Sequence, residues 1–299
     1  EIQAPAGQWK RALQIHAEAL SDSTYGPEEV AAGVALAREE ARRRLRDPAE
    51  TARGALLDLH SPLAGLKRWR AVLGGNLEAV TGRELSDWHR RIFAPGNMVL
   101  AVSGDVPAIE VLDEAARLYG AFRGSAVPAP AGSPMAAQGR FRYRLLQGNT
   151  RIGRILFGFP LPGAASRDYP ALEVLSAALG LGNGSVLAGR LRDRDKLIYE
   201  GTTEWKPERG PGFLTIQVTA APGAIDRAEI AVLAELELLK RAPMDEADLE
   251  RARAQLERVY RDGLQTVSGR AGMLALFEIR GDWKRIDRHL DDIRKVRAE

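Results

Sequence analysis

The sequence predicts an α+β protein built from two sheet-plus-helices domains, of which the first is incomplete. The two halves follow one plan, strands followed by helices, except that the early strands are missing from the first half. A stretch of small residues at 124–139 separates the halves, and one strand is predicted before it against four after it. We therefore expect a partial domain over residues 1–123, a linker over 124–139 and a complete domain over 140–299.

The first half is predicted to be mainly helical. Its clearest helix begins at Pro27, with acidic residues in the first turn where the helix dipole favours them, and stops at Asp47-Pro48. A polar, glycine-containing stretch is expected up to Gly82, and the apolar run NMVLAVSG predicts a buried strand over Met98–Ser103. Apolar spacing predicts further helices at Gln8–Leu20, Ala49–Leu59, Arg83–Phe93 and Pro107–Phe122.

The second half follows the segment GSAVPAPAGSPMAAQG, whose proline and glycine content and lack of apolar period indicate a linker. Four strands are predicted beyond it, at Phe141–Leu146, Ile152–Pro160, Ile198–Trp205 and Gly212–Ala221. Helical patterns predict the remaining elements: Tyr169–Leu179, a short helix after the glycine-rich turn, Ala224–Arg241, Asp245–Thr266, Gly269–Arg280 and Trp283–Val296.

The lone strand of the first half needs partners. An isolated strand leaves its N–H and C=O groups unpaired on both edges, which a folded domain avoids. We therefore expect its sheet to be completed by a portion preceding Glu1 or by strands taken from elsewhere.

The composition excludes several classes of protein. With 299 residues, of which 45% are hydrophobic, the chain can bury sizeable cores. The absence of cysteine excludes a disulfide scaffold, thiolate zinc sites and cysteine nucleophiles. A balance of 43 basic and 40 acidic residues does not suggest a nucleic-acid partner. No apolar run approaches the roughly 20 residues of a membrane span, so we expect a soluble protein of the cytoplasm or periplasm.

The histidines do not form a zinc motif. His16, His60, His89 and His289 lie far apart, and none belongs to H-E-x-x-H or H-x-x-E-H, which place two imidazoles on one helix face. This argues against a complete zinc site within the chain. His89 and His289 lie in charged helical sequence and are expected to face solvent.

Three other polar features have a structural and a functional interpretation. Glu39 and Glu40 are interpreted either as a solvated acidic pair bonded to Arg43 or Arg44, or as the source of a carboxylate that ligates a metal. The sequence alone favours the solvated pair. The turn Gly180–Ser185 lacks the Gly-Lys-Ser/Thr of a phosphate loop and is expected to end a helix.

The third feature is the pair Arg192 and Tyr199, seven residues apart in LRDRDKLIY. An arginine at a helix end and a tyrosine on the next strand could converge on a substrate carbonyl or carboxylate. The alternative is a surface arginine with a half-buried tyrosine. If Ile198 belongs to the core, strand alternation turns Tyr199 outward.

Three segments together resemble the insulinase and mitochondrial processing peptidase family, the pitrilysin-type zinc peptidases with an inverted motif. RELSDWHRRIFAPGNMVLAVSGDV (Arg83–Val106) is similar to the family's helix, turn and strand ending in Gly-Asp. RILFGFPLPG and DYPALEVLSAALGLGNGS (within Arg154–Ser185) are similar to the opening of its second domain. LRDRDKLIY (Leu191–Tyr199) matches its L-R-x-x-x-x-L-x-Y run.

The resemblance implies two homologous domains of processing-peptidase type closing around a chamber in which zinc-bound water cleaves peptides. Residues 1–123 then form the C-terminal part of the first peptidase-like domain, and 140–299 the second. Arg192 and Tyr199 take the positions of the pair that holds substrate and stabilises the transition state. Glu40 takes the position of the distal zinc-ligand glutamate, with Glu39 as the near alternative, while Gly33 replaces a second acidic residue often found seven residues earlier.

The family's H-x-x-E-H segment would lie before Glu1. We therefore expect this chain alone to bind no zinc and to act in a homo- or heterodimer with a zinc-motif-bearing subunit, on a peptide substrate. Retention of the Arg–Tyr pair favours this peptidase function. The alternative is a non-catalytic structural subunit like the family's core proteins in respiratory complexes, and a weaker one is a generic α/β binding protein.

Overall fold

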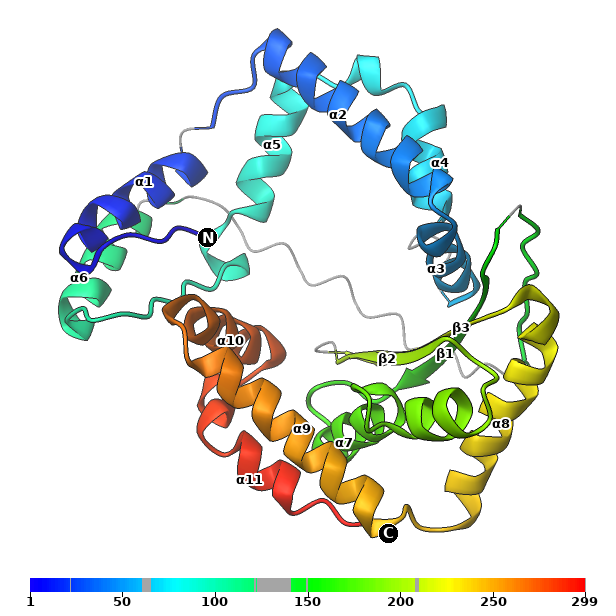
Figure 1. Cartoon of the computed structure of the whole chain (residues 1–299). Coiled ribbons are helices and arrows are strands. Elements are labelled where there is room, and N and C mark those ends of the chain that lie inside the picture. Colours follow the sequence, from blue (N-terminus) through cyan, green and yellow to red (C-terminus); the bar gives the residue numbers. More distant parts are fainter. Residues whose placement is uncertain are drawn as a thin grey trace.

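The computed structural model describes residues 1–21, 23–60, 66–120, 122, 141–148, 150–207 and 210–298. Within these ranges the sheet has three antiparallel strands, β1 (Gly153–Leu161), β2 (Glu200–Lys206) and β3 (Gly212–Ala220), in the order β1-β3-β2 (Figure 1). The predicted linker at 124–139 lies outside the described residues. Helices account for the rest of the regular structure, which confirms the α+β class.

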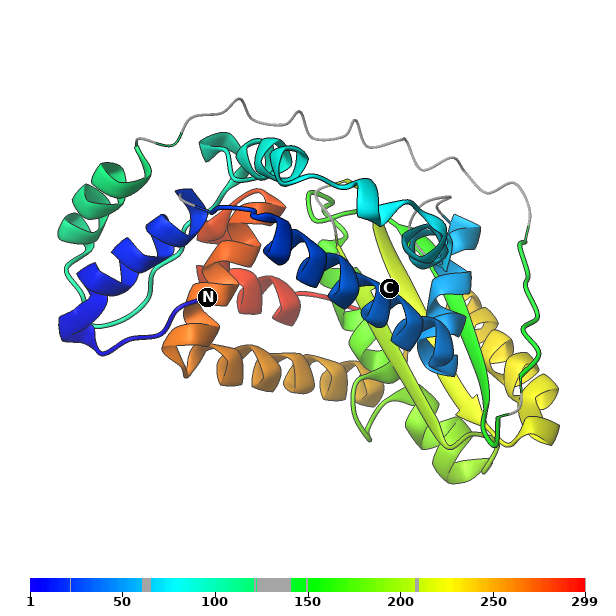
Figure 2. The ribbon, with the colours of Figure 1, turned by 90° about the horizontal axis from the view of Figure 1, so that it is seen from above.

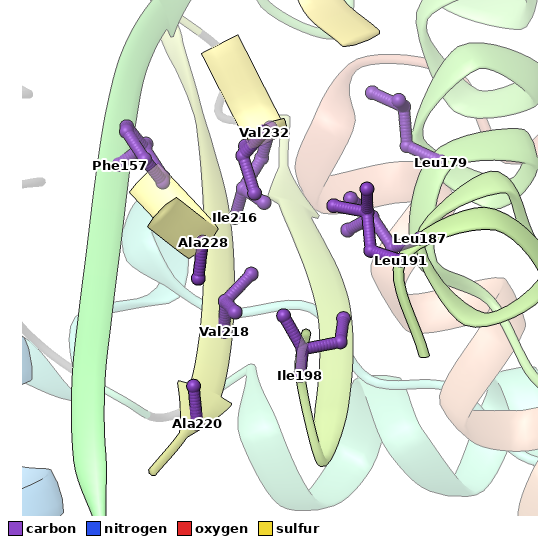
Figure 3. Close-up of a cluster of buried hydrophobic side chains, with 10 residues drawn as sticks. All are labelled: Phe157, Leu179, Leu187, Leu191, Ile198, Ile216, Val218, Ala220, Ala228 and Val232. Carbon is purple, nitrogen blue, oxygen red and sulfur yellow. The ribbon is translucent and has the colours of Figure 1, made fainter. Parts of the chain in front are cut away.

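One face of this sheet carries the main hydrophobic core. Alternate residues of β3, among them Leu214, Ile216 and Val218, are buried, as expected when successive side chains point to opposite faces. Ile216 and Val218 pack in one cluster with Val232 of helix α8 (Ile225–Arg241) and with Leu191 of a π-helix at Leu187–Arg194 (Figure 3). The π-helix is therefore anchored directly against the sheet.

A second core joins the helices that follow. Val174 of α7 (Tyr169–Gly180) packs with Leu249 of α9 (Glu246–Leu264) and Ile293 of α11 (His289–Arg294). Helix α10 (Val267–Arg280) and a 3₁₀ segment at Trp283–Asp287 complete this layer. The second half thus covers one face of its own sheet with helices, as Figures 1 and 2 show.

Six helices make up the described first half: α1 (Trp9–Ser21), α2 (Pro27–Arg46), α3 (Pro48–His60), α4 (Leu66–Gly74), α5 (Gly82–Ile92) and α6 (Ala108–Tyr119). Helix α2 packs on α3 and α4, and α1 packs on α6. Pro27 occupies the predicted first position of α2, and Thr81 and Glu84 form a capping box on α5.

Helix α3 crosses to the second half and covers the other face of the sheet. Arg53 pairs with Glu204 of β2 at 2.9 Å, and the His60 ring lies 4.6 Å from that of Phe213 of β3, centroid to centroid. Leu56 also lies against Gly158 of β1. The sheet is therefore covered from both sides, by helices that come from both halves of the chain.

Two predicted strands are absent from the described sheet. Residues 98–103 and 141–146 belong to no strand, and no ladder joins either segment to a neighbour among the described residues. Without a partner strand their apolar side chains stay accessible, with Leu100 at 43% and Phe141 at 75% exposure. The prediction of a buried strand at Met98–Ser103 is thus wrong, as is that of a strand at Phe141–Leu146.

Two helix predictions also need correction. Helix α4 forms within the stretch predicted to be polar and irregular, because its glycines lie at the ends and leave LKRWRAVLG uninterrupted. The predicted helix Trp283–Val296 is divided into the 3₁₀ segment and α11, which meet at Arg288. The other helices start and end within a few residues of their predicted positions.

Gly180 is required where α7 meets β2. A Cβ atom built on Gly180 would lie 2.5 Å from the backbone nitrogen of Thr203, and the Thr203 hydroxyl donates to the Ser176 carbonyl at 2.6 Å. Gly180→Ala must separate helix and strand, so we expect it to lower the free energy of unfolding by about 1–3 kcal/mol in urea denaturation. Gly189→Ala is the matched control, because nothing lies within 4 Å of that position. Equal losses in both variants would contradict this account.

Ionisation of Tyr169 is expected to lower the free energy of unfolding at alkaline pH. Burial raises the pKa of Tyr169 to about 12, and its hydroxyl accepts from Arg280 at 3.1 Å. In the unfolded chain the phenol ionises near its ordinary pKa of 10.0, whereas in the folded chain it stays protonated up to about pH 12. The contribution of the neutral phenol to the free energy of unfolding is therefore complete below pH 10 and is lost as the pH rises toward 12. We expect the free energy of unfolding to fall by about 2–3 kcal/mol over this window.

The measurement is urea denaturation at a series of pH values. Tyr169→Phe should flatten the decline, whereas Tyr143→Phe, at a residue 61% exposed, should leave it unchanged. A decline equally steep in the Tyr169 variant would refute the assignment.

Candidate functional site

Arg192 is held by the π-helix. Leu187 and Leu191 on this helix are each 1% exposed, and the backbone N–H of Leu197 donates back to the Leu191 carbonyl at 2.9 Å. π-Helical turns occur frequently at functional sites. With its neighbour Leu191 locked in the core, the Arg192 backbone has little freedom to move.

The guanidinium of Arg192 is oriented by two side chains. Its Nε and Nη2 donate to the two carboxylate oxygens of Asp193 at 2.8 and 3.0 Å, and Nη1 donates to Oδ1 of Asn183 at 3.0 Å. The hydrogen bond to Asp193 raises the pKa of Arg192, and the same bond lowers the pKa of Asp193. Arg192 thus remains charged and its plane is fixed from two sides.

Tyr199 follows directly after a core residue. Ile198 is 4% exposed and belongs to the main core, whereas Tyr199 is 58% exposed, as strand alternation predicts. The backbone N–H of Tyr199 donates to the Thr219 carbonyl at 2.7 Å, which extends the pairing of β2 with β3. The ring is therefore presented to solvent from a fixed backbone.

The turn between Arg192 and Tyr199 is built on Lys196. Its φ of 55° lies in the left-handed region, which costs a residue with a side chain about 1–2 kcal/mol. The turn leads from the π-helix that carries Arg192 to Tyr199, the residue directly before β2. Among the described residues, no recorded hydrogen bond joins their side chains, and their convergence on a ligand stays a prediction.

Glu40 lies on α2 among arginines. Its carboxylate accepts from Arg43 at 2.9 Å and from Arg44 at 2.5 Å, and these hydrogen bonds lower its pKa to about 2. Glu39 lies 3.6 Å from Arg42. Glu40 thus pairs with Arg43 and Arg44 as predicted, Glu39 pairs with Arg42 instead, and the role of Glu40 as a metal ligand stays a prediction.

The histidines are occupied by structural contacts. His89 bonds the Tyr25 hydroxyl at 2.7 Å and the Leu20 carbonyl at 2.6 Å, and His289 is 6% exposed with Nε2 3.2 Å from Glu173. The prediction that these two histidines face solvent is wrong, because each ties its helix to a neighbouring segment.

The remaining two histidines are half-buried. His16 bonds Tyr119 at 2.7 Å, and the His60 ring lies tilted against that of Phe213. Burial lowers the pKa of both. Across the part of the chain that the structure describes, no three histidine, aspartate or glutamate side chains gather as a metal site would need. These residues do not fit a zinc ion.

Sequence reasoning missed the residues that surround Arg192. Asp193 is adjacent in the chain, and an acid beside a candidate arginine was a usable signal. Asn183 belongs to the turn Gly180–Ser185, where Gly182 adopts φ 73° and the Ser185 N–H donates to the Gly182 carbonyl. The expected tight turn is confirmed, and it also brings an amide oxygen to Arg192.

A polar cleft of about 300 Å³ lies beside the same turn. Arg190 and Asp248 line this cleft, and Arg190 pairs with Asp248 of α9 at 3.0 Å and with Glu235 of α8 at 2.7 Å. These ion pairs fasten the π-helix to two other helices. They contribute a second reason why the backbone of Arg192 is rigid.

The chain is similar to known proteins. Residues 79–256 match a family model described as the peptidase M16 inactive domain. The zinc protease PqqE of Helicobacter pylori is 21% identical over 206 residues, which make up 68% of this chain and 46% of that protein. The chain thus spans about half the length of the curated relatives it matches.

Solved structures share the fold. A protease from Helicobacter pylori superposes with a TM-score of 0.83 at 16% identity, covering 99% of this chain and 73% of the other. A chain of complex III2 from Candida albicans gives 0.75 at 14% identity, covering 99% and 73%. In the part of the chain that the structure describes, no helix has both the length and the apolar character needed to cross a membrane.

Proposed function

The chain belongs to the peptidase M16 inactive-domain family, and we propose that it supplies the peptide-holding half of a zinc peptidase. Relatives that match it are named zinc proteases, so zinc and peptide hydrolysis are properties of the family. Since the described residues gather no group of three possible metal ligands, most ligands of the metal would come from another polypeptide segment or subunit. The chain's own contribution would be Arg192 and Tyr199.

The observation that carries this proposal is the exposure of Tyr199 directly after the buried Ile198, at the start of the strand that follows the π-helix carrying Arg192. A phenol O–H and a guanidinium are both hydrogen-bond donors, and a peptide carbonyl is an acceptor. The two side chains would hold a substrate carbonyl and keep donating as negative charge develops on its oxygen. A preorganised donor of this kind is worth about 3–4 kcal/mol of barrier.

Peptide binding by the chain alone tests the proposal. A fluorescein-labelled peptide of mixed sequence should raise fluorescence anisotropy when titrated with the wild-type chain. Arg192→Ala should weaken binding about tenfold, because it removes hydrogen bonds from a charged donor. Arg194→Ala is the matched control, since Arg194 forms the same two-point pair with Asp195.

Two results would contradict the peptide-holding role. One is the absence of any binding by the wild type, and the other is an equal loss in both arginine variants. Binding that depends on Arg192 alone is the expected outcome.

The second candidate is a non-catalytic structural subunit. It is favoured by the family model's description as an inactive domain and by the shared fold with a chain of complex III2. A structural subunit has no need of a peptide site, so the binding experiment separates the two functions.

A further inference from the structure

We infer that the polar face of the sheet, the side on which α3 lies, binds peptide side chains by charge, with Glu200 taking a basic side chain and Arg154 an acidic one. The inference rests on the proposed function and deepens it, because it assigns a substrate class: peptides that carry both charges within a short stretch. Glu200 and Arg154 are then specificity-determining residues.

The strand register places the two charges in one row across the sheet. Arg154 of β1 and Glu200 of β2 both lie opposite Thr219 of β3, and residues directly opposite each other in neighbouring antiparallel strands share a face. The next row on the same face consists of Leu156, Gln217 and Thr202. This face is therefore mostly polar, in contrast to the core face of the same three strands.

The recorded contacts of helix α3 with this face lie further along the strands. Arg53 of α3 pairs with Glu204, and Leu56 of α3 lies against Gly158. Glu204 and Gly158 belong to one row of the register, two rows beyond the row of Glu200. The helix therefore neutralises the charge at one position of β2 and makes no recorded ion pair at the other.

Glu200 and Arg154 are available to a ligand. Glu200 is exposed and Arg154 half-buried, and among the described residues no hydrogen bond or ion pair is recorded for either side chain. Glu204, on the same face of the same strand, pairs with Arg53 at 2.9 Å and with Lys206 at 3.2 Å. An unpaired acid and an unpaired base in one row thus differ from their neutralised neighbours.

The spacing of the two charges suits an extended peptide. Neighbouring strands lie about 4.8 Å apart, so the backbones of Arg154 and Glu200 are separated by roughly 10 Å. Side chains two residues apart on one side of an extended peptide are about 7 Å apart, a difference that long side chains can bridge. Thr219 between the two charges is short and only 8% exposed, so it does not stand in the way of such a peptide.

Glu200 connects this row to the peptide-holding pair. It follows Tyr199 directly in the chain, and its negative charge acts on the Arg192 guanidinium. A peptide whose carbonyl is held by Arg192 and Tyr199 would therefore have neighbouring side chains within reach of Glu200. A peptide with charges of both signs gains from both residues, whereas a peptide with one sign only meets a like charge at one of them.

Three labelled peptides of equal length test the inference. Two carry a glutamate and a lysine two residues apart, in either order, and the third carries glutamine at both positions. All three have the same net charge, so a general attraction to the protein cannot separate them. Anisotropy with the full wild-type chain should show that one charged order binds about two- to fivefold more tightly than the glutamine peptide, the range for exposed ion pairs.

The variants Glu200→Gln and Arg154→Gln should each reduce this preference. Glu204→Gln is the matched control, because it removes an equal charge from the same face of the same strand, at a carboxylate that Arg53 already neutralises. It should leave the preference unchanged.

The outcomes separate this inference from the proposed function. If the wild type binds none of the three peptides, the peptide-holding role is wrong and the inference fails with it. If it binds all three equally, or if the preference survives in the Glu200 and Arg154 variants, the charge inference alone is wrong. An equal loss of preference in the Glu204 variant would also overturn it.

Discussion

Replacing Leu191 with alanine is expected to lower the free energy of unfolding by about 2–5 kcal/mol. Leu191 is 1% exposed and packs in the core between the π-helix and the sheet (Figure 3). Its removal takes apolar contacts from the core and leaves a cavity that neighbouring strands cannot close without moving. Urea denaturation of the purified chain measures this loss.

Leu36→Ala is the control for this experiment. Leu36 on α2 is 73% exposed, so its truncation should change the free energy of unfolding by no more than about 0.5 kcal/mol. A small loss in the Leu191 variant, or an equally large loss in the control, would show that the π-helix is not anchored as described. Because Arg192 is the next residue, the Leu191 variant should also bind peptide more weakly.

Replacing Tyr199 with phenylalanine is expected to lower turnover about a hundredfold to a thousandfold when peptide hydrolysis is measured with a zinc-motif-bearing partner. The substitution keeps the ring and removes only the hydroxyl donor. If that donor bonds most strongly to the oxygen that gains charge, kcat falls while KM changes little. Arg192→Ala should impair both quantities, because a guanidinium also holds the carbonyl of the ground state.

Tyr143→Phe is the matched control for hydroxyl loss. Tyr143 is 61% exposed, and its ring stacks on Phe141 at a centroid distance of 6.4 Å. Its variant should retain full activity. If the Tyr199 variant also keeps full activity, the proposed role of the Tyr199 hydroxyl in catalysis is wrong.

The local features of the fold were predictable because they depend on neighbours in sequence. Pro27 at the start of α2, the tight turn after Gly180 and the outward direction of Tyr199 all follow from backbone preferences or strand alternation. The family resemblance, which was carried by the segments between Arg83 and Tyr199, agrees with the match over residues 79–256.

Features that depend on distant partners were not predictable in the same way. Whether Met98–Ser103 becomes a strand depends on a neighbouring strand, and its apolar run carries no information about one. His289 lies in charged sequence, yet it is buried because Tyr260 and Phe277 pack around it from other helices. Asn183 likewise acquires its role from a turn whose direction is set by α7.

The docking of α3 on the sheet has a consequence for how the chain is made. Arg53 and Glu204 are 151 residues apart, so the ribosome completes α3 long before it produces the strand that α3 covers. At ordinary translation rates of 5–20 residues per second, this interval lasts roughly 8 to 30 seconds. Throughout that time the face of α3 that carries Leu56 and His60 has no sheet to cover. During this period the nascent chain therefore presents Leu56 without the strand that later packs against it, which favours aggregation and capture by chaperones.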